Sequence, residues 1–312
     1  SLSFSNKDLA APLISRMKLP TFFSNLLPEG ALRQLICEQL KIHLDDEFVL
    51  LEALGDDLPG AITVKRIYDM SEVSFNQKKN MRIDREEEGD DYLHFSLAGV
   101  QMKFSMRQQD GRYTISRPGL IGDYIIKTPS TIHAFVPLNE FSCMKLAEAV
   151  GIEIPDVKLV SLSDLDGLPK INLPHEDKAY LIKRFDRADG QRIHIEDFAQ
   201  VFSVRSHRKY NATNYDSIAR LIHNLLPNGL AEVQNFIRRI IFNILIGNTD
   251  AHLQNWSVIY KNKITPSLSP AYDLVSTLSY IDNRELALNF AKKKELYQIN
   301  ENHLKYFGIS TV

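Results

Sequence analysis

Side chains able to take part in phosphoryl transfer follow directly on an apolar segment of the chain. The stretch "IGNTDAHLQNW", residues 246–256, places Asp250, His252 and Asn255 within six positions. A carboxylate such as Asp250 can orient an attacking hydroxyl and accept its proton. The amide oxygen of Asn255 suits the hard cation Mg²⁺, and Asp273 in "PAYDLVS" offers a carboxylate for the same ion. These residue types therefore indicate magnesium-assisted transfer of a phosphoryl group.

The residues upstream fit the same chemistry. The small residues of "SLAGVQMK" can form a turn whose N–H groups bind phosphate oxygens. Lys127 follows on the apolar strand "DYIIKTP", where it is either a solvent-facing edge residue or a buried cation that needs an anion such as an ATP phosphate. The hinge-like "IKRFD" comes later and brings Phe185, which can pack beside an adenine or in the core.

The order of these parts is more informative than any one of them. Asp250 and Asn255 have the D-x-x-x-x-N spacing of a protein-kinase catalytic loop, and the preceding parts stand in the order in which kinases use them. Each signal alone is typical of an ordinary hairpin, strand or turn. His252 alone would be a hydrogen-bonded loop residue.

The elements that must position these residues can be read from periodicity. Apolar residues at helical spacing predict helices at 29–41, at 138–151 with Asn139 as the cap, and in "YDSIARLIHNLL" and "LAEVQNFIRRIIFNILIG". Residues 48–64 predict a short helix, a turn and a strand. A hairpin with "SLAGVQ" at its tip, short strands at "YIIK", "AYLIK", "WSVIY" and "ELALNFA", and an exposed linker over 81–91 complete the reading.

These elements predict an α+β fold in which strands dominate the first half of the chain and helices the second. We expect a sheet-rich lobe over residues 1–182, divided into 1–92 and 93–182, and a helical catalytic lobe over 183–312. A cleft between two such lobes is a natural ligand site.

Composition narrows the function class. The 312 residues carry a net charge of -2, which speaks against a strong global field for nucleic acid. Cys37 and Cys143 lack metal-like spacing and favour a reducing compartment. No apolar run is long enough to span a bilayer and the first residues lack a secretory signal, so we expect a cytoplasmic protein without a membrane partner.

Nearly the whole chain resembles the HipA-like serine/threonine kinases, toxins of bacterial toxin–antitoxin systems. The resemblance is carried by "FFSNLLPEGALRQL", "FVLLEALGDDLPGAITV", "SLAGVQMKFSM", "YIIKTP", "NEFSCMKLAEAVGIEIPDV", "YLIKRFDR", "IGNTDAHLQNWSV" and "LSPAYDLVST". It implies a two-lobed protein-kinase-like fold, the cofactors ATP and Mg²⁺, and phosphorylation of a protein substrate, with aminoacyl-tRNA synthetases as the targets of relatives.

The resemblance also implies roles for particular residues. Asp250 would be the catalytic base, Asn255 and Asp273 the Mg²⁺ ligands, and Glu140 the partner of Lys127. Ser96 matches the autophosphorylated loop serine. The ATP-binding residues would be Ala98, Gly99, Val100, Gln101, Met102, Lys103, Lys127, Lys183, Arg184, Phe185, His252, Asn255, Tyr272 and Asp273.

The ends of the chain differ from HipA. About twenty residues precede "FFSNLLPEG", where HipA has a further small subdomain, so the chain resembles the HipT kinases of three-component HipBST systems more closely. The resemblance implies two partners: a small HipS-like protein, and a HipB-like helix-turn-helix antitoxin that makes most of the DNA contact. We expect Phe22, Phe23, Leu26 and Leu27 either to form an apolar patch for the HipS-like protein or to fold into the chain's own core.

Two other function classes stay open on the sequence. One is a catalytically weak ATP-binding pseudokinase that serves as an interaction platform, although the base and metal positions are all filled. The other is a small-molecule phosphotransferase of the aminoglycoside-kinase type, which shares the D-x-x-x-x-N spacing. The identity of the substrate is not encoded in any motif of the chain.

Overall fold

A computed structural model of the chain describes residues 1–3, 18–66, 102–115, 121–168 and 176–311. The exposed linker expected at 81–91 and the hairpin tip "SLAGVQ" lie outside these residues. In the described part of the chain, no helix is long and apolar enough to cross a membrane.

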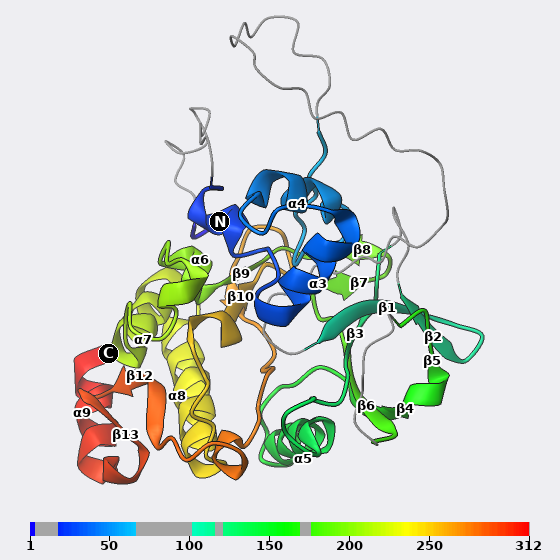
Figure 1. Cartoon of the computed structure of the whole chain (residues 1–312). Helices are drawn as coiled ribbons and strands as arrows, with labels where there is room; N and C mark the ends of the chain where they lie inside the picture. The colour runs from blue at the N-terminus through cyan, green and yellow to red at the C-terminus, as the bar shows by residue number, and fades with distance from the viewer. Residues whose placement is uncertain (4–17, 67–101, 116–120, 169–175, 312) are drawn as a thin grey trace, which may run out of the picture.

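The first lobe is built on a six-stranded sheet with the strand order β4-β6-β3-β1-β2-β5 (Figure 1). All neighbouring strands are antiparallel except β2 and β5, which run parallel. The strands are β1 (Lys103–Gln109), β2 (Arg112–Ile115), β3 (Tyr124–Lys127), β4 (Val157–Ser161), β5 (Leu165–Asp166) and β6 (Lys178–Lys183). The predicted strands at "YIIK" and "AYLIK" are thereby confirmed as β3 and β6.

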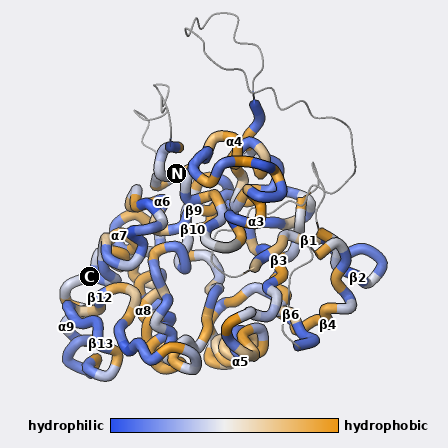
Figure 2. Tube along the Cα trace, viewed as in Figure 1, coloured by the Kyte–Doolittle hydropathy of each residue, from blue (hydrophilic) through white to orange (hydrophobic). Residues whose placement is uncertain are grey.

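Alternation along β6 packs the two faces of this sheet against different helices. Leu181 belongs to the apolar cluster shared with α3 (Gly30–Leu40) and α4 (Glu47–Ala53). Its neighbours Tyr180 and Ile182 point to the other face, where they pack with Met144 of α5 (Val136–Ala149). The strands β3, β4 and β6 and the helix α5 are accordingly largely hydrophobic in Figure 2.

The N-terminal segment is part of this core. Phe22 of α2 (Thr21–Ser24), Leu26 and Leu27 are at most 5% exposed, and the partly buried Phe23 packs against the same cluster. The prediction of an exposed apolar patch on these residues is therefore wrong for Phe22, Leu26 and Leu27. Apolar residues fit a partner's surface and a core equally well, and here the chain buries them itself.

The second lobe surrounds the paired helices α7 (Tyr215–Leu225) and α8 (Gly229–Leu245), both of which were predicted. Their core includes Phe236, Trp256 and Phe290. The remaining elements of this lobe are β7 (Arg187–Ala188), β8 (Gln191–Arg192), β9 (Ile195–Asp197), α6 (Phe198–Val201), β10 (Ser257–Ile259), β11 (Ser267–Leu268), β12 (Glu285–Phe290), β13 (Lys293–Glu295) and α9 (Glu301–Thr311).

Short 3-10 turns connect these elements: η1 (Leu162–Asp164), η2 (Ser206–Arg208), η3 (Leu253–Asn255), η4 (Thr277–Ser279) and η5 (Leu296–Gln298).

Two local predictions fail. Helix α5 starts at Val136, so Asn139 lies inside the helix and is not its cap. The Asn139 side chain instead donates to the Ser276 carbonyl and the Tyr280 hydroxyl, each at 3.1 Å. No strand forms over residues 61–64, where the chain runs as a loop.

Candidate active site

A buried ion pair joins the end of the first sheet to α5. Lys127 ends β3 and its Nζ lies 2.6 Å from Oε1 of Glu140 on α5, with 5% and 2% of the two residues exposed. Burial alone would lower the pKa of Lys127, but the carboxylates of Asp273 and Glu140 outweigh it and raise the pKa above its ordinary value. Lys127 and Glu140 are thus brought together as an ion pair, and the lysine remains a cation.

Asp273 brings the second lobe to this pair. Its Oδ1 accepts a hydrogen bond from Lys127, and its Oδ2 lies 3.5 Å from Nζ of Lys103 on β1. Burial alone would raise the pKa of Asp273, but the two ammonium groups lower it well below the ordinary value. The backbone of Asp273 has φ of +54°, a left-handed conformation that aspartate tolerates better than most residues and that is common at functional turns.

The predicted base lies on the loop that follows α8. Gly247 ends this helix with φ of +68°, and a β-carbon there would lie 2.7 Å from the side chain of Leu278, so glycine is required. Asp250 then receives a hydrogen bond at Oδ1 from the Tyr210 hydroxyl at 2.7 Å. Its carbonyl accepts from Nδ2 of Asn255 at 3.0 Å, so the two residues of the D-x-x-x-x-N spacing are in contact.

Asn248 ties the two functional loops together. Its Oδ1 accepts from the Asp250 amide at 3.0 Å, while its Nδ2 lies 3.3 Å from the Asp273 carbonyl and 2.7 Å from Oδ1 of Asn243. Asn248, Asn255 and Asp273 also line one cavity. Burial raises the pKa of Asp250, and the hydrogen bond from Tyr210 opposes that shift.

His252 lies beside the base but is buried and neutral. It is 7% exposed, and burial together with the charge of Lys209 lowers its pKa to about 3. Its Nδ1 has no hydrogen-bond partner in the described part of the chain. This environment suits a hydrogen-bonding role toward a bound group better than proton transfer.

The predicted hinge residues Lys183, Arg184 and Phe185 differ in whether their side chains contact other residues of the site. The rings of Phe185 and Tyr272 lie 5.6 Å apart at 36°, so the structure brings these two predicted ATP-binding residues together. The Tyr272 hydroxyl is held by the Gln254 carbonyl at 2.9 Å and Oγ of Ser257 at 2.6 Å. The Lys183 side chain is half exposed, with its Nζ 4.0 Å from Oδ2 of Asp156.

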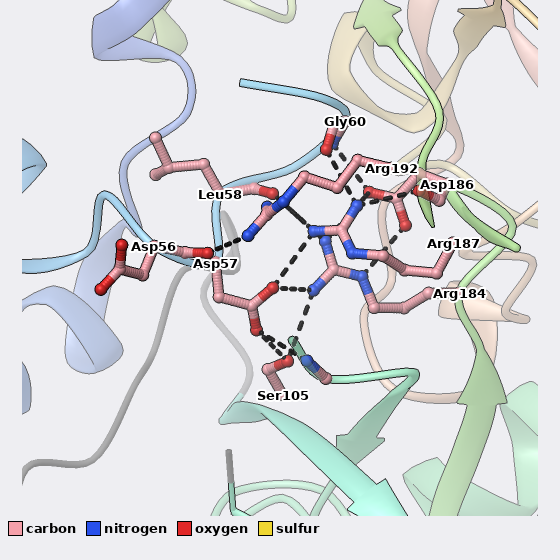
Figure 3. A network of polar contacts seen from close by, with 10 residues as sticks. Asp56, Asp57, Leu58, Gly60, Ser105, Arg184, Asp186, Arg187 and Arg192 are labelled. Atoms are coloured by element: carbon pink, nitrogen blue, oxygen red, sulfur yellow. Dashed lines mark hydrogen bonds and ion pairs between the residues drawn. The ribbon is translucent and has the colours of Figure 1, made fainter. Parts of the chain in front are cut away.

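The Arg184 side chain lies in a buried ion-pair network. It is 3% exposed, and its guanidinium binds Asp57 at 2.9 Å and Asp186 at 2.9 Å (Figure 3). Arg187 converges on the same two carboxylates, and Ser105 of β1 donates to Asp57. The Arg184 side chain therefore has a structural role among the described residues. A role of its main chain in ATP binding stays a prediction.

The phosphate-facing loop can be placed only at its end. Ser96, Ala98, Gly99, Val100 and Gln101 lie outside the described residues. Met102 packs partly buried against the N-terminal core, and Lys103 begins β1 directly opposite Lys127 of β3. Burial lowers the pKa of Lys103 although Asp273 opposes the shift, so a phosphate beside it would stabilise its charged form.

The donor set fits a magnesium–nucleotide complex. Among the described residues no group of three or more His, Cys, Asp or Glu side chains is arranged to hold a metal. Mg²⁺ at phosphoryl-transfer sites is held by one or two protein oxygens together with phosphates and waters. Asp273 and Asn255 suit that mode, and Lys103 and Lys127 supply positive charge for phosphates.

Sequence reasoning missed Tyr210, Lys209, Asn248 and Glu29 at this site. Tyr210 and Lys209 precede α7 by only a few residues and showed no periodicity or motif of their own. Asn248 stands two residues before Asp250 and could have been noticed as a polar residue directly after a helix-ending glycine. Contacts that join residues 40 to 180 positions apart leave no local signal.

Comparisons with known proteins point to the HipA-like family. The family profile described as the HipA-like C-terminal domain matches residues 95–309, and that described as the HipA N-terminal domain matches residues 1–65. Y4dM of Sinorhizobium fredii, provisionally named a kinase, is 42% identical over 317 aligned positions, and the alignment covers 99% of this chain and 76% of Y4dM. The serine/threonine-protein kinase toxin HipA of Shewanella oneidensis is 28% identical over 304 aligned positions, and the alignment covers 87% of this chain and 66% of HipA.

One solved structure shows the fold. HipA of Shewanella oneidensis MR-1, in a complex with HipB and operator DNA, superposes with a TM-score of 0.72 at 24% identity, covering 94% of this chain and 72% of that one. The predicted two-lobed, HipA-like α+β fold is confirmed by this likeness.

Proposed function

Because this chain belongs to the HipA-like family, we propose that it is a serine/threonine protein kinase that acts as the toxin of a bacterial toxin–antitoxin system. The observation that carries the proposal is the meeting of Lys127, Glu140 and Asp273 beside the Asp250 loop. A lysine held by a helix glutamate and a metal-binding aspartate must both be in place for a protein kinase to work.

Each residue of the site has a proposed task. Lys127 binds the α- and β-phosphates of ATP, and Lys103 adds positive charge where the phosphates lie. Asp250 orients the acceptor hydroxyl and takes its proton. Asn255 and Asp273 would hold Mg²⁺, which when bound neutralises phosphate charge. Phe185 and Tyr272 form an apolar surface for the adenine.

The metal assignment can be tested by binding alone. Asp273→Asn removes one negative charge from the proposed Mg²⁺ site, so the ATP affinity gained on adding Mg²⁺ should shrink in this variant. Isothermal titration with ATP, with and without Mg²⁺, measures that gain. ATP binding by the unaltered protein that ignores Mg²⁺ would contradict the kinase assignment.

The target is proposed to be a protein, with an aminoacyl-tRNA synthetase as the first candidate. Incubating the protein with a bacterial lysate and ATP labelled in the γ-phosphate tests this. Label on a discrete lysate protein supports the proposal. Label found only on small molecules would indicate a small-molecule phosphotransferase, and ATP binding without transfer would indicate a pseudokinase.

The proposed partners are a HipB-like DNA-binding antitoxin and a HipS-like small protein, as in the HipBST systems. The HipB-like partner is supported by the Shewanella HipA structure, which contains HipB and operator DNA. The HipT-type role and the HipS-like partner rest on the sequence resemblance alone, and burial of Phe22, Leu26 and Leu27 removes the surface first expected for that contact. Co-expression with the neighbouring small open reading frames, followed by size-exclusion chromatography, tests both partners.

A further inference from the structure

The proposed base is held by a tyrosine from a distant loop. The Tyr210 hydroxyl donates a 2.7 Å hydrogen bond to Oδ1 of Asp250, and the Tyr210 ring lies edge-on to His252 with the ring centres 5.0 Å apart. We propose that Tyr210 is a positioning residue that fixes Asp250 in its working orientation, and that Glu29 of the N-terminal segment holds Tyr210 in place through Lys209. The kinetic part of this inference rests on the proposed function.

The hydrogen bond from Tyr210 gives the two carboxylate oxygens of Asp250 different roles. Oδ1 of Asp250 is occupied by Tyr210, whereas no residue of the described chain donates a hydrogen bond to Oδ2. Oδ2 is therefore the oxygen left for the hydroxyl of a substrate. A hydrogen bond to a charged acceptor restrains it more strongly than a neutral one does. Without the phenol, the carboxylate of Asp250 can rotate about its Cβ–Cγ bond and lose this alignment.

Lys209 fixes the loop that carries Tyr210. It is 6% exposed, and its Nζ lies 2.8 Å from Oε2 of Glu29. A buried ammonium group is expensive unless it is paired, so Glu29 determines where Lys209 and the adjoining Tyr210 lie. The Lys209 carbonyl also faces the amide of Leu253 in the catalytic loop, at 3.5 Å.

A second chain of hydrogen bonds runs beside this pair. Nε2 of Gln254, next to Asn255, donates to Oγ of Ser206 at 3.0 Å, and that hydroxyl donates to Oδ1 of Asn25 at 3.0 Å. Nδ2 of Asn25 in turn donates to the Val204 carbonyl at 2.8 Å. Residues 25–29 thus contact the loop before α7 directly and reach the catalytic loop through Ser206. The N-terminal segment is a support of the base as well as a part of the first core.

Two variants and two matched controls test this inference. Tyr210→Phe removes only the hydroxyl, and Glu29→Gln removes the charge that pairs with Lys209. Tyr124→Phe loses a hydroxyl whose contact is Gln108 on the sheet. Glu47→Gln alters a buried carboxylate of the N-terminal core that binds the Leu19 amide and Ser24, away from the catalytic loop. The controls report what a general loss of stability does.

The first measurement needs no kinase activity. Hydrogen–deuterium exchange of the backbone amides of residues 248–255 should become roughly tenfold faster in Tyr210→Phe and Glu29→Gln and stay unchanged in both controls. Unchanged exchange in Tyr210→Phe, or equal acceleration in Glu47→Gln, would overturn the inference whether or not the protein is a kinase.

The second measurement separates positioning from binding. Tyr210→Phe should lower kcat for phosphoryl transfer roughly 10- to 100-fold while the KM for ATP stays the same, because the nucleotide site is untouched. Glu29→Gln should lower kcat less, and the double variant should fall no further than Tyr210→Phe alone, since both act through one contact. A wild-type kcat in Tyr210→Phe would overturn the role of Tyr210, and multiplicative losses in the double variant would overturn the link through Glu29. A protein that transfers no phosphate at all would contradict the proposed function, and the exchange measurement would still decide this inference.

Discussion

Lys103 and Lys127 stand directly opposite each other on β1 and β3, and both side chains reach the carboxylate of Asp273. Like charges on opposite strands destabilise a sheet, and Lys103 carries the further cost of burial. Lys103 therefore lowers the stability of the nucleotide-free protein, and a lysine in this position is suited to binding an anion. ATP phosphates would give Lys103 a further anionic partner beside Asp273, from which its Nζ lies 3.5 Å away.

Replacing Lys103 tests whether this lysine lowers stability but strengthens ATP binding. Lys103→Met should leave the melting temperature of the nucleotide-free protein equal or higher, because a buried charge disappears, but should weaken ATP binding about tenfold. Thermal unfolding with and without ATP and Mg²⁺ measures both effects. Lys178→Met, which changes a half-exposed lysine at the start of β6, is the control. A clear loss of stability without nucleotide, together with normal ATP binding, would contradict the assignment of Lys103.

The network of Arg184 should be a major source of stability. Asp57→Asn leaves Arg184 and Arg187 buried with one carboxylate fewer, and breaking a buried pair costs about 3 to 5 kcal/mol. The adjacent Asp56→Asn is the matched control, because Asp56 joins the network only through its carbonyl, which accepts from Arg192 (Figure 3). Urea unfolding should separate the two variants by several kcal/mol. Equal stabilities would show that the ion pairs contribute little.

Glu196 should make stability depend on acid pH. Burial alone would raise its pKa, but hydrogen bonds from His194, Ser1 and Tyr260 lower it to about 2. A carboxylate with a lowered pKa stabilises the fold above its ordinary value of 4.5, and this stability is lost as the pH falls toward 2. At pH 7, Glu196→Gln should therefore be less stable than the unaltered protein by up to about 3 kcal/mol.

The difference in unfolding free energy between the unaltered protein and Glu196→Gln should narrow below about pH 4.5. In this range Glu196 begins to bind a proton in the unfolded chain but not in the folded one. Urea unfolding at several pH values between 7 and 3 measures this difference. Glu301→Gln serves as the control, since Glu301 is exposed and pairs only with Lys305 on the surface of α9. A gap that stays constant with pH would contradict the lowered pKa of Glu196.

Ser96 should be a phosphorylated switch. It lies outside the described residues, so this prediction still rests on the sequence resemblance. A phosphoserine adds roughly -1.5 to -2 charges to a loop expected to face ATP, which would repel the nucleotide phosphates. Mass spectrometry after incubation with Mg²⁺ and ATP should find one loop phosphate, and none in Ser96→Ala. Phosphate found solely at other residues, or full activity of the Ser96-phosphorylated protein, would contradict the switch.

The helices and strands could be predicted because their signals are local. The apolar spacing in residues 215–226 and 230–247 predicted α7 and α8, and the apolar runs around Ile126 and Leu181 predicted β3 and β6. The meeting of Lys127, Glu140 and Asp273 could be anticipated only from the order of kinase parts, because residues 127 and 273 have no local relation. The ion pair of Arg184 could not be predicted, since a charged residue at the end of a strand gives no sign that its partner, Asp57, lies 127 positions earlier. The contact between Tyr210 and Asp250 escaped for the same reason.

The most direct test of the central claim is phosphoryl transfer by the unaltered protein and by Asp250→Gln, measured beside ATP binding. The unaltered protein should move the γ-phosphate of ATP to protein, onto itself or a lysate target. Asp250→Gln should bind ATP and Mg²⁺ with nearly the same affinity, because Lys127, Asn255 and Asp273 remain, but should transfer no detectable phosphate. Transfer by Asp250→Gln at the rate of the unaltered protein would contradict the account of this site.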